Sequence, residues 1–118
     1  MKYINLIFSL LMISFVIVQY NDPDIFYWGT IYCMPAFFSG IVGLYPQIFR
    51  RESMKLTFAS CTLFIIFLTG FYWPKDPNWF LVDIWWEKEI VREGMGMMIS
   101  SFVMIFSALT IYRLKRIL

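Results

Sequence analysis

An all-α fold, a bundle of four transmembrane helices, is predicted for this sequence by three observations. Hydrophobic residues make up 60% of its 118 residues and charged residues 15%, whereas soluble domains are about 45 to 50% apolar and about 25% charged. Four apolar runs can each form a helix of about 20 residues, the length that crosses a bilayer. Short connections leave room for one domain over residues 1–118, with spans at about 3–20, 23–48, 55–73 and 92–112.

The first connection is a polar segment, residues 19–24, between two of these runs. Asn21 or Asp22 can cap the free N–H groups at the start of the second helix, and Pro23 suits the first helical position. Asp24 complements the positive end of the helix dipole. Proline also disfavours the helical conformation for the residue before it. We therefore expect a tight hairpin, with one helix ending just before this segment and the next beginning within it.

Three of the predicted helices carry a characteristic stripe at helical spacing. In the first span, the residues Asn5, Ser9, Met12, Val16 and Gln19 recur at helical spacing, which gathers the polar side chains of the span onto one face. Small residues form a ridge on the second span, at Gly29, Cys33, Ala36, Gly40 and Gly43. The last span has a polar and small face, at Glu89, Glu93, Gly96, Ser100 and Ser107. Polar side chains in lipid prefer neighbouring helices, and small residues let helices approach closely, so these faces should point into helix contacts.

The third connection, residues 74–91, is rich in tryptophan. Asp76-Pro77 repeats the capping pattern of the first hairpin, and tryptophans concentrate at the headgroup level of membranes. We therefore expect a short interfacial helix between spans three and four. Aromatic residues should also form a girdle at this end of the bundle, at Tyr20, Tyr27, Trp28, Tyr72, Trp73, Trp79, Trp85 and Trp86.

Basic residues predict the orientation of the spans. Seven of the ten lysines and arginines flank the same side of the predicted spans: Lys2, Arg50, Arg51, Lys55, Arg113, Lys115 and Arg116. Because basic residues are enriched in cytoplasmic connections, both termini are expected in the cytoplasm. We expect a multi-pass protein of the cell membrane, most simply the bacterial cytoplasmic membrane.

The first hairpin and the start of the last span also carry strings of family-specific sequence. These are Val18-Gln19-Tyr20-Asn21-Asp22-Pro23-Asp24, Tyr32-Cys33-Met34-Pro35-Ala36, Gly43-Leu44-Tyr45-Pro46, and Glu89 with Arg92-Glu93-Gly94-Met95-Gly96. In this order they resemble the transmembrane protein 220 family. The resemblance covers the first two spans and the start of the fourth. It implies a small four-span protein with no established activity, and thus a topology rather than a reaction.

The predicted topology places the first hairpin and the start of the last span at the same membrane face. This predicts an outer-face polar cluster of Gln19, Asn21, Asp22, Asp24, Glu89, Arg92 and Glu93. Arg92 opposite Asp22 or Asp24 would make a charge-assisted pair. One interpretation is structural, with helix caps and an ion pair fastening this end of the bundle. The other is functional, because ionisable groups at membrane depth often bind an ion, a proton or a headgroup.

Composition argues against several classes of function. Histidine is absent, and Cys33 and Cys61 lie in different spans without metal-ligand spacing, so we expect no metal site and no cofactor. No nucleophile and base have a familiar spacing, which predicts a protein that is not an enzyme. Basic residues at span ends do not indicate a nucleic-acid partner. Two functions remain: an accessory or packing subunit in a larger membrane complex or a homo-oligomer, and a binder or carrier of a small ligand, cation or lipid headgroup through the outer-face polar cluster.

Overall fold

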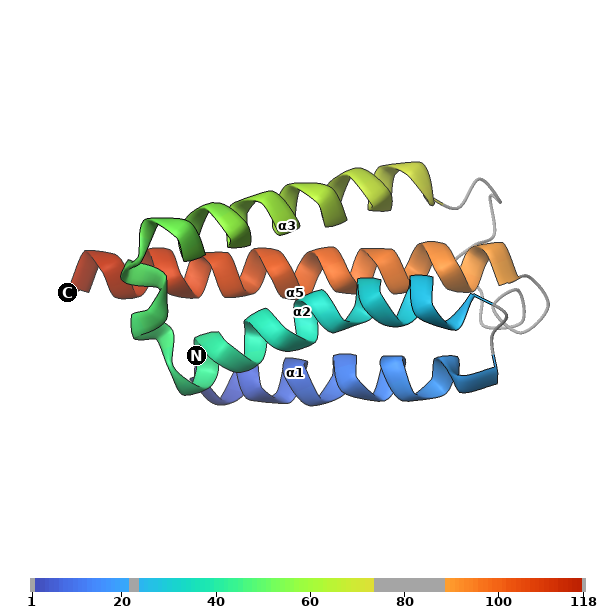
Figure 1. The fold of residues 1–118 in the computed structure, drawn as a ribbon, viewed down its shortest axis with the longest axis horizontal. Helices are drawn as coiled ribbons and strands as arrows, with labels where there is room; N and C mark the ends of the chain where they lie inside the picture. The colour runs from blue at the N-terminus through green and yellow to red at the C-terminus, as the bar shows by residue number, and fades with distance from the viewer. Residues whose placement is uncertain (1, 22–23, 74–88, 118) are drawn as a thin grey trace.

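The computed structural model describes residues 2–21, 24–73 and 89–117; side chains 21, 89–92 and 115–117 lie outside this description. The described residues form four long helices and two short 3₁₀ helices (Figure 1): α1 (Lys2–Ile17), η1 (Val18–Asn21), α2 (Ile25–Leu44), η2 (Pro46–Arg50), α3 (Glu52–Phe71) and α5 (Glu89–Ile117). Each long helix contains a stretch long and apolar enough to cross a membrane. The predicted all-α, four-span fold is confirmed. The expected interfacial helix falls outside the described residues.

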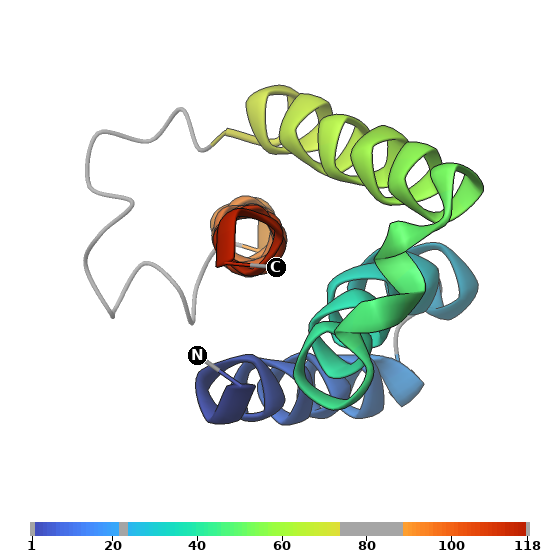
Figure 2. The same cartoon turned by 90° about the vertical axis from the view of Figure 1, so that its left-hand side faces the viewer.

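Helix α5 lies at the centre of the arrangement. Viewed along its axis, α5 has α1 and α3 on two sides, and α2 lies beside α1 (Figure 2). It contacts all three other long helices, whereas α2 and α3 touch each other little. Half of the membrane-spanning stretch of α5 is buried, compared with 17% for α1 and for α3. The two chain ends lie at the same end of the bundle as η2 (Figure 1).

Helix α2 is shorter than the predicted span 23–48. It begins at Ile25, with the exposed Asp24 at the N-cap position and no side-chain cap hydrogen bond. It ends at Leu44, because Pro46 forces the preceding Tyr45 out of the helical region, to φ −147° and ψ 66°. The chain then continues as η2, in which Pro46 occupies the first turn.

Helices α3 and α5 begin three residues before their predicted spans. Helix α3 starts at Glu52, whose carboxylate suits a helix N-terminus, and it ends at Phe71 rather than at residue 73. Helix α5 continues to Ile117, five residues past the predicted end, although its apolar stretch covers only Glu93–Leu114. Backbone hydrogen bonds sustain a helix beyond its apolar part. Hydropathy alone therefore predicts α5 too short at both ends and places the start of α3 too late.

The polar stripe of α1 points into the bundle, as predicted. Asn5 is fully buried; its amide nitrogen donates to the Thr110 hydroxyl and its oxygen accepts from the Ser107 hydroxyl, each at 3.0 Å. The Ser9 hydroxyl donates to the backbone carbonyl of Ala36 at 2.7 Å. These bonds join α1 to α5 and to α2. Since lipid offers no partner to a polar group, they favour this one register of the helices.

Candidate functional site

The candidate site is the end of the bundle opposite the termini, where α1 ends and α2 and α5 begin. The structure places Gln19 half-buried in η1, Asp24 exposed at the start of α2, and Glu93 half-buried in the first turns of α5. Asn21 ends η1, and Glu89 and Arg92 lie in α5, with side chains outside the described part. The predicted pairing of Arg92 with Asp22 or Asp24 therefore lies outside the described residues.

Two tyrosines join α2 to the end of α3 at this site. The hydroxyls of Tyr27 and Tyr72 are 2.9 Å apart and share a hydrogen bond. Tyr72 lies just beyond the end of α3, and its pKa is raised to about 12. The hydrogen bond to Tyr27 is the main cause, and burial and the charges of Tyr27, Glu93 and Asp24 act in the same direction. The negative charges of Asp24 and Glu93 thus both act on the Tyr72 hydroxyl, although they are the smallest of these causes.

Beneath these polar groups the bundle is closed by aromatic side chains. Trp28, 4% exposed, stacks on Tyr32 at a ring distance of 5.9 Å and meets Tyr72 edge-on at 5.1 Å. A Cβ atom built at Gly96 would overlap the Tyr32 hydroxyl group, so glycine at this position lets Tyr32 pack against α5. The prediction that Trp28 belongs to the outer girdle is wrong, because this side chain fills the helix interface instead.

The predicted small-residue ridge of α2 divides into two halves. In the half near the termini, a Cβ at Gly40 would meet the Ser9 hydroxyl oxygen at 3.0 Å, and one at Gly43 would meet Leu6 at 2.8 Å. These glycines allow α1 to approach α2. In the other half, a Cβ at Gly29 would meet nothing within 4 Å, and Cys33 is exposed. Ala36, 8% exposed, lies between the two halves.

The open half of the ridge is a surface of small side chains that we call the α2 notch, defined by Gly29, Thr30 and Cys33. Thr30 and Cys33 are exposed, and two large exposed side chains flank them on the same helix face. These are Phe26, 88% exposed, and Phe37, 57% exposed. The Thr30 hydroxyl donates to the Phe26 carbonyl at 2.6 Å, so the notch presents little unsatisfied polarity.

The described part of the chain contains no group of three histidine, cysteine or carboxylate side chains placed to hold a metal ion. Within the same residues, every buried side-chain nitrogen or oxygen has a hydrogen-bond partner. Some of these bonds join two helices, as for Asn5 and Ser9, and others stay within one helix, as for Ser39 and Ser100. At the outer end, Tyr27 and Tyr72 share a hydrogen bond, and the carboxylates of Asp24 and Glu93 add negative charge that would attract a cation.

Sequence reasoning missed the partners of several of these residues. It placed Asn5 and Ser107 on inward faces without pairing them, and it gave Tyr32 no role. Comparing how far each residue lies along its helix, and so how deep it lies in the membrane, could have found these contacts. In antiparallel helices, Asn5 near the start of α1 reaches the same level as Ser107 and Thr110 near the end of α5. By the same reasoning Tyr32 and Gly96 lie at matching depths in the parallel helices α2 and α5.

These features define a class: a small integral membrane protein whose four apolar helices pack around a hydrophobic core that includes hydrogen-bonded polar side chains. The profile of transmembrane family 220 matches residues 11–109. The chain therefore belongs to that family, as the residue strings at the first hairpin and at the start of the last span predicted. No curated protein and no solved structure matches the chain.

Proposed function

We propose that this protein is a non-enzymatic accessory subunit of the membrane, which packs against a helix of another membrane protein or of a second copy through the α2 notch. The observation that carries this proposal is the open space at Gly29. A Cβ atom there would meet nothing within 4 Å, whereas side chains of α1 already occupy the space beside Gly40 and Gly43. The proposal assigns the protein no catalytic reaction and no nucleic-acid partner.

Close approach is the main source of affinity between helices in lipid. The hydrophobic effect does not drive association there, so van der Waals packing of small residues against a neighbouring backbone becomes decisive. The α2 notch offers such a surface between Phe26 and Phe37, whose large rings can pack on either side of an incoming helix. These two residues are eleven positions apart, which corresponds to about 16 Å along the helix.

The test is substitution of Gly29 by leucine, with Gly70→Leu as the matched control. Both glycines lie in apolar helices and have nothing within 4 Å of a Cβ, but Gly70 lies on α3, away from the notch. We expect Gly29→Leu to abolish co-purification of the partner after mild extraction and Gly70→Leu to retain it. Equal recovery with both variants would refute the proposal. Gly40→Leu is a poorer test, because it would clash with Ser9 inside the bundle.

Cysteine cross-linking separates the two kinds of partner. Cys33 is exposed at the notch, and Cys61 is replaced by serine to leave one reactive thiol. If the partner is a second copy, oxidation in the membrane should give a Cys33–Cys33 dimer that Gly29→Leu prevents. If the partner is another protein, a Cys33-directed photo-cross-linker should capture one defined adduct instead.

A second function, binding of a cation or a polar headgroup at the outer end, is favoured by one observation. Asp24 at the start of α2 and Glu93 in the first turns of α5 lie at the same end of the bundle, and the charges of both raise the pKa of Tyr72. Glu93→Gln should then remove any cation- or pH-dependent gain in thermal stability, while Glu52→Gln at the opposite end should keep it. Wild-type stability that does not respond to any cation would refute this function.

We further propose that the end carrying the termini faces the cytoplasm, in the cytoplasmic membrane of a bacterium. Lys2, Arg50, Arg51 and Lys55 support this orientation because they gather at one end of the bundle with η2. Labelling of single cysteines in intact cells should leave position 51 protected and position 24 reactive to a membrane-impermeant reagent. The opposite pattern would reverse the orientation.

A further inference from the structure

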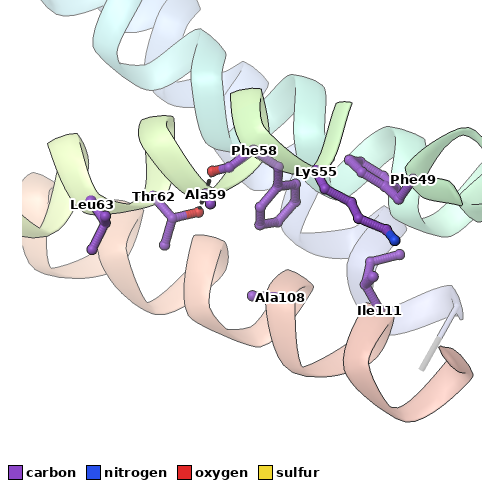
Figure 3. Close-up of a pocket in the computed structure, with 8 residues that line it drawn as sticks. All are labelled: Phe49, Lys55, Phe58, Ala59, Thr62, Leu63, Ala108 and Ile111. Atoms are coloured by element: carbon purple, nitrogen blue, oxygen red, sulfur yellow. Dashed lines mark hydrogen bonds between the residues drawn. The ribbon is translucent and has the colours of Figure 1, made fainter. Parts of the chain in front are cut away.

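An apolar groove of about 360 Å³ separates α3 from α5 near the end that carries the termini (Figure 3). Phe49 of η2 and residues of both helices line it: Lys55, Phe58, Ala59, Thr62, Leu63, Ala108 and Ile111. The volume lies within the range of about 300 to 1,000 Å³ typical of small-molecule sites. The groove belongs neither to the outer-face polar cluster nor to the α2 notch.

Small side chains create the groove. Ala59 on α3 and Ala108 on α5 line it where larger residues would close the gap between the helices. The Thr62 hydroxyl donates to the Phe58 carbonyl at 2.8 Å, so it does not present a free donor to the groove. The lining thus favours a hydrocarbon chain over a polar ligand.

The groove is short enough to lie within one leaflet. Lys55 and Leu63 are eight residues apart on α3, which corresponds to about 12 Å along the helix axis. Half of a hydrocarbon core about 30 Å thick is about 15 Å. A chain that enters beside Lys55 can therefore lie along the groove without crossing the bilayer centre.

A positive charge marks the membrane-surface end of the groove. Lys55 lies in the first turn of α3, and its stem runs past Phe49 and Ile111 so that the ammonium group sits at the end of the lining (Figure 3). Its nearest acidic partner is Glu52, at 3.5 Å, whose side chain is 84% exposed. Such an exposed pair is weak because water screens its charges, so it competes little with a phosphate for the lysine.

We propose that this groove binds one anionic phospholipid of the leaflet on the side of the termini, with an acyl chain between α3 and α5 and its phosphate at Lys55. An apolar cleft that ends in an ammonium group at the membrane surface complements both parts of such a lipid. Basic pockets between helices on the cytoplasmic side bind anionic headgroups for this reason. Arg50 and Arg51, on the connection beside Phe49, add to the positive potential.

Native mass spectrometry of the detergent-extracted full chain tests the proposal, with phosphatidylglycerol and phosphatidylcholine of identical acyl chains titrated separately. We expect one tightly bound lipid, with about a fivefold preference for phosphatidylglycerol, as one lysine near the surface supplies. Lys55→Gln should remove the preference, and Lys55→Arg should keep it. Lys2→Gln, which removes an exposed lysine at the same end outside the groove, should also keep it.

Filling the groove provides an independent test. Ala59→Phe should lower binding of both lipids at least fivefold, whereas Ser60→Phe, on the adjacent exposed position outside the groove, should leave binding unchanged. Equal binding of the two lipids by the wild type would overturn the proposal, as would equal effects of the two phenylalanine variants. It would also be overturned if Ala59→Phe changed the number of protein copies rather than the lipid count, because the occupant would then be a second chain.

Discussion

The α1–α2 and α3–α5 seams both join antiparallel helices, yet they pack differently. Along the α1–α2 seam, Gly40 and Gly43 bring the helix backbones close, and Ser9 donates a hydrogen bond across the seam. Nothing larger than a glycine fits at position 43, since a Cβ there would lie 2.8 Å from Leu6 and 3.1 Å from the Lys2 carbonyl oxygen. The two helices are therefore in close contact at both glycine positions that face α1.

The α3–α5 seam is closed only near the outer end. There the Thr69 hydroxyl lies 3.0 Å from the Met97 carbonyl oxygen and also hydrogen-bonds the Ser101 hydroxyl. Toward the termini the helices separate around the groove between Ala59 and Ala108. The aromatic rings of Phe38, Phe49 and Phe58 then connect α2, η2 and α3 at centroid distances of 4.9 to 6.3 Å.

The difference shows that small residues can have opposite effects in a membrane bundle. Gly43 lies opposite a side chain that fills its space, so the small residue draws the helices together. Ala59 and Ala108 line an unfilled gap, so the small residues leave room between the helices. Whether a small residue tightens or opens an interface therefore depends on what faces it, which the spacing along one helix does not show.

The largest expected effect compares a closed glycine with an open one. Gly43→Ala should lower the free energy of unfolding by about 1 to 3 kcal/mol, the usual cost of overpacking, because its Cβ meets both Leu6 and a backbone carbonyl. Gly70→Ala, in open space on α3, should stay within about 0.5 kcal/mol of wild type. Equilibrium unfolding in mixed micelles measures both. Equal losses would mean that the α1–α2 seam is not tighter.

A smaller effect is expected where α1 meets α5. Asn5→Ala removes the hydrogen bonds to Thr110 and Ser107. Interhelical hydrogen bonds in membranes average about 0.6 kcal/mol each, so the loss should be about 1 kcal/mol. Ser14→Ala is the control, since the Ser14 hydroxyl bonds only within α1, to the Leu11 carbonyl, among the contacts described. An Asn5 variant as stable as the control would show that these bonds contribute nothing.

The closed end of the α3–α5 seam should show a still smaller effect. Thr69→Val keeps the shape of the side chain and removes the contacts of its hydroxyl with Met97 and Ser101, which predicts a loss of about 0.6 kcal/mol. Hydrogen exchange should then increase in α3 more than in α1. Thr57→Val provides the comparison, because the Thr57 hydroxyl bonds the Ser53 carbonyl within α3. Identical exchange in both variants would contradict a role for Thr69 across the seam.

The smallest effect at neutral pH is expected for Tyr27→Phe, which removes the hydrogen bond to Tyr72. The pKa of Tyr72 should fall from about 12 toward its ordinary value of 10. A raised tyrosine pKa means that the neutral form is favoured by folding, so its contribution is complete below pH 10 and is lost as the pH rises through about 12. Tyrosinate absorbance during alkaline titration measures the shift. An unchanged titration would exclude the Tyr27 bond as its cause.

Hydropathy and helical spacing were enough to predict the class, the number of spans and the inward face of α1. The polar stripe was recognisable because Asn5 and Ser9 lie on one face of an otherwise apolar helix, and lipid leaves such groups only other helices as partners. Helix ends were harder to predict. The end of α2 had a local signal in Pro46, whereas the ends of α5 extend into sequence that its hydropathy does not distinguish from a connection.

The candidate site was predicted in part. The sequence indicated that Asp24 and Glu93 would share one membrane face, since the order and number of the spans decide which connections lie together. It did not indicate that the charges of both would act on Tyr72, or that Trp28 would be buried. The surroundings of Tyr72 and the burial of Trp28 depend on how far each helix is rotated about its own axis. Helices that are apolar around most of their surface leave this rotation unspecified.

The order of apolar and polar residues by itself determined that the chain crosses the membrane four times, because the cost of placing polar backbone and charge in hydrocarbon acts on each segment separately. Only the tertiary structure decided that α5 is the central helix, that half of the α2 ridge stays open, and that α3 and α5 separate around a groove. These features arise from contacts between helices, where similar apolar faces differ little in hydrophobic energy and shape selects the partner.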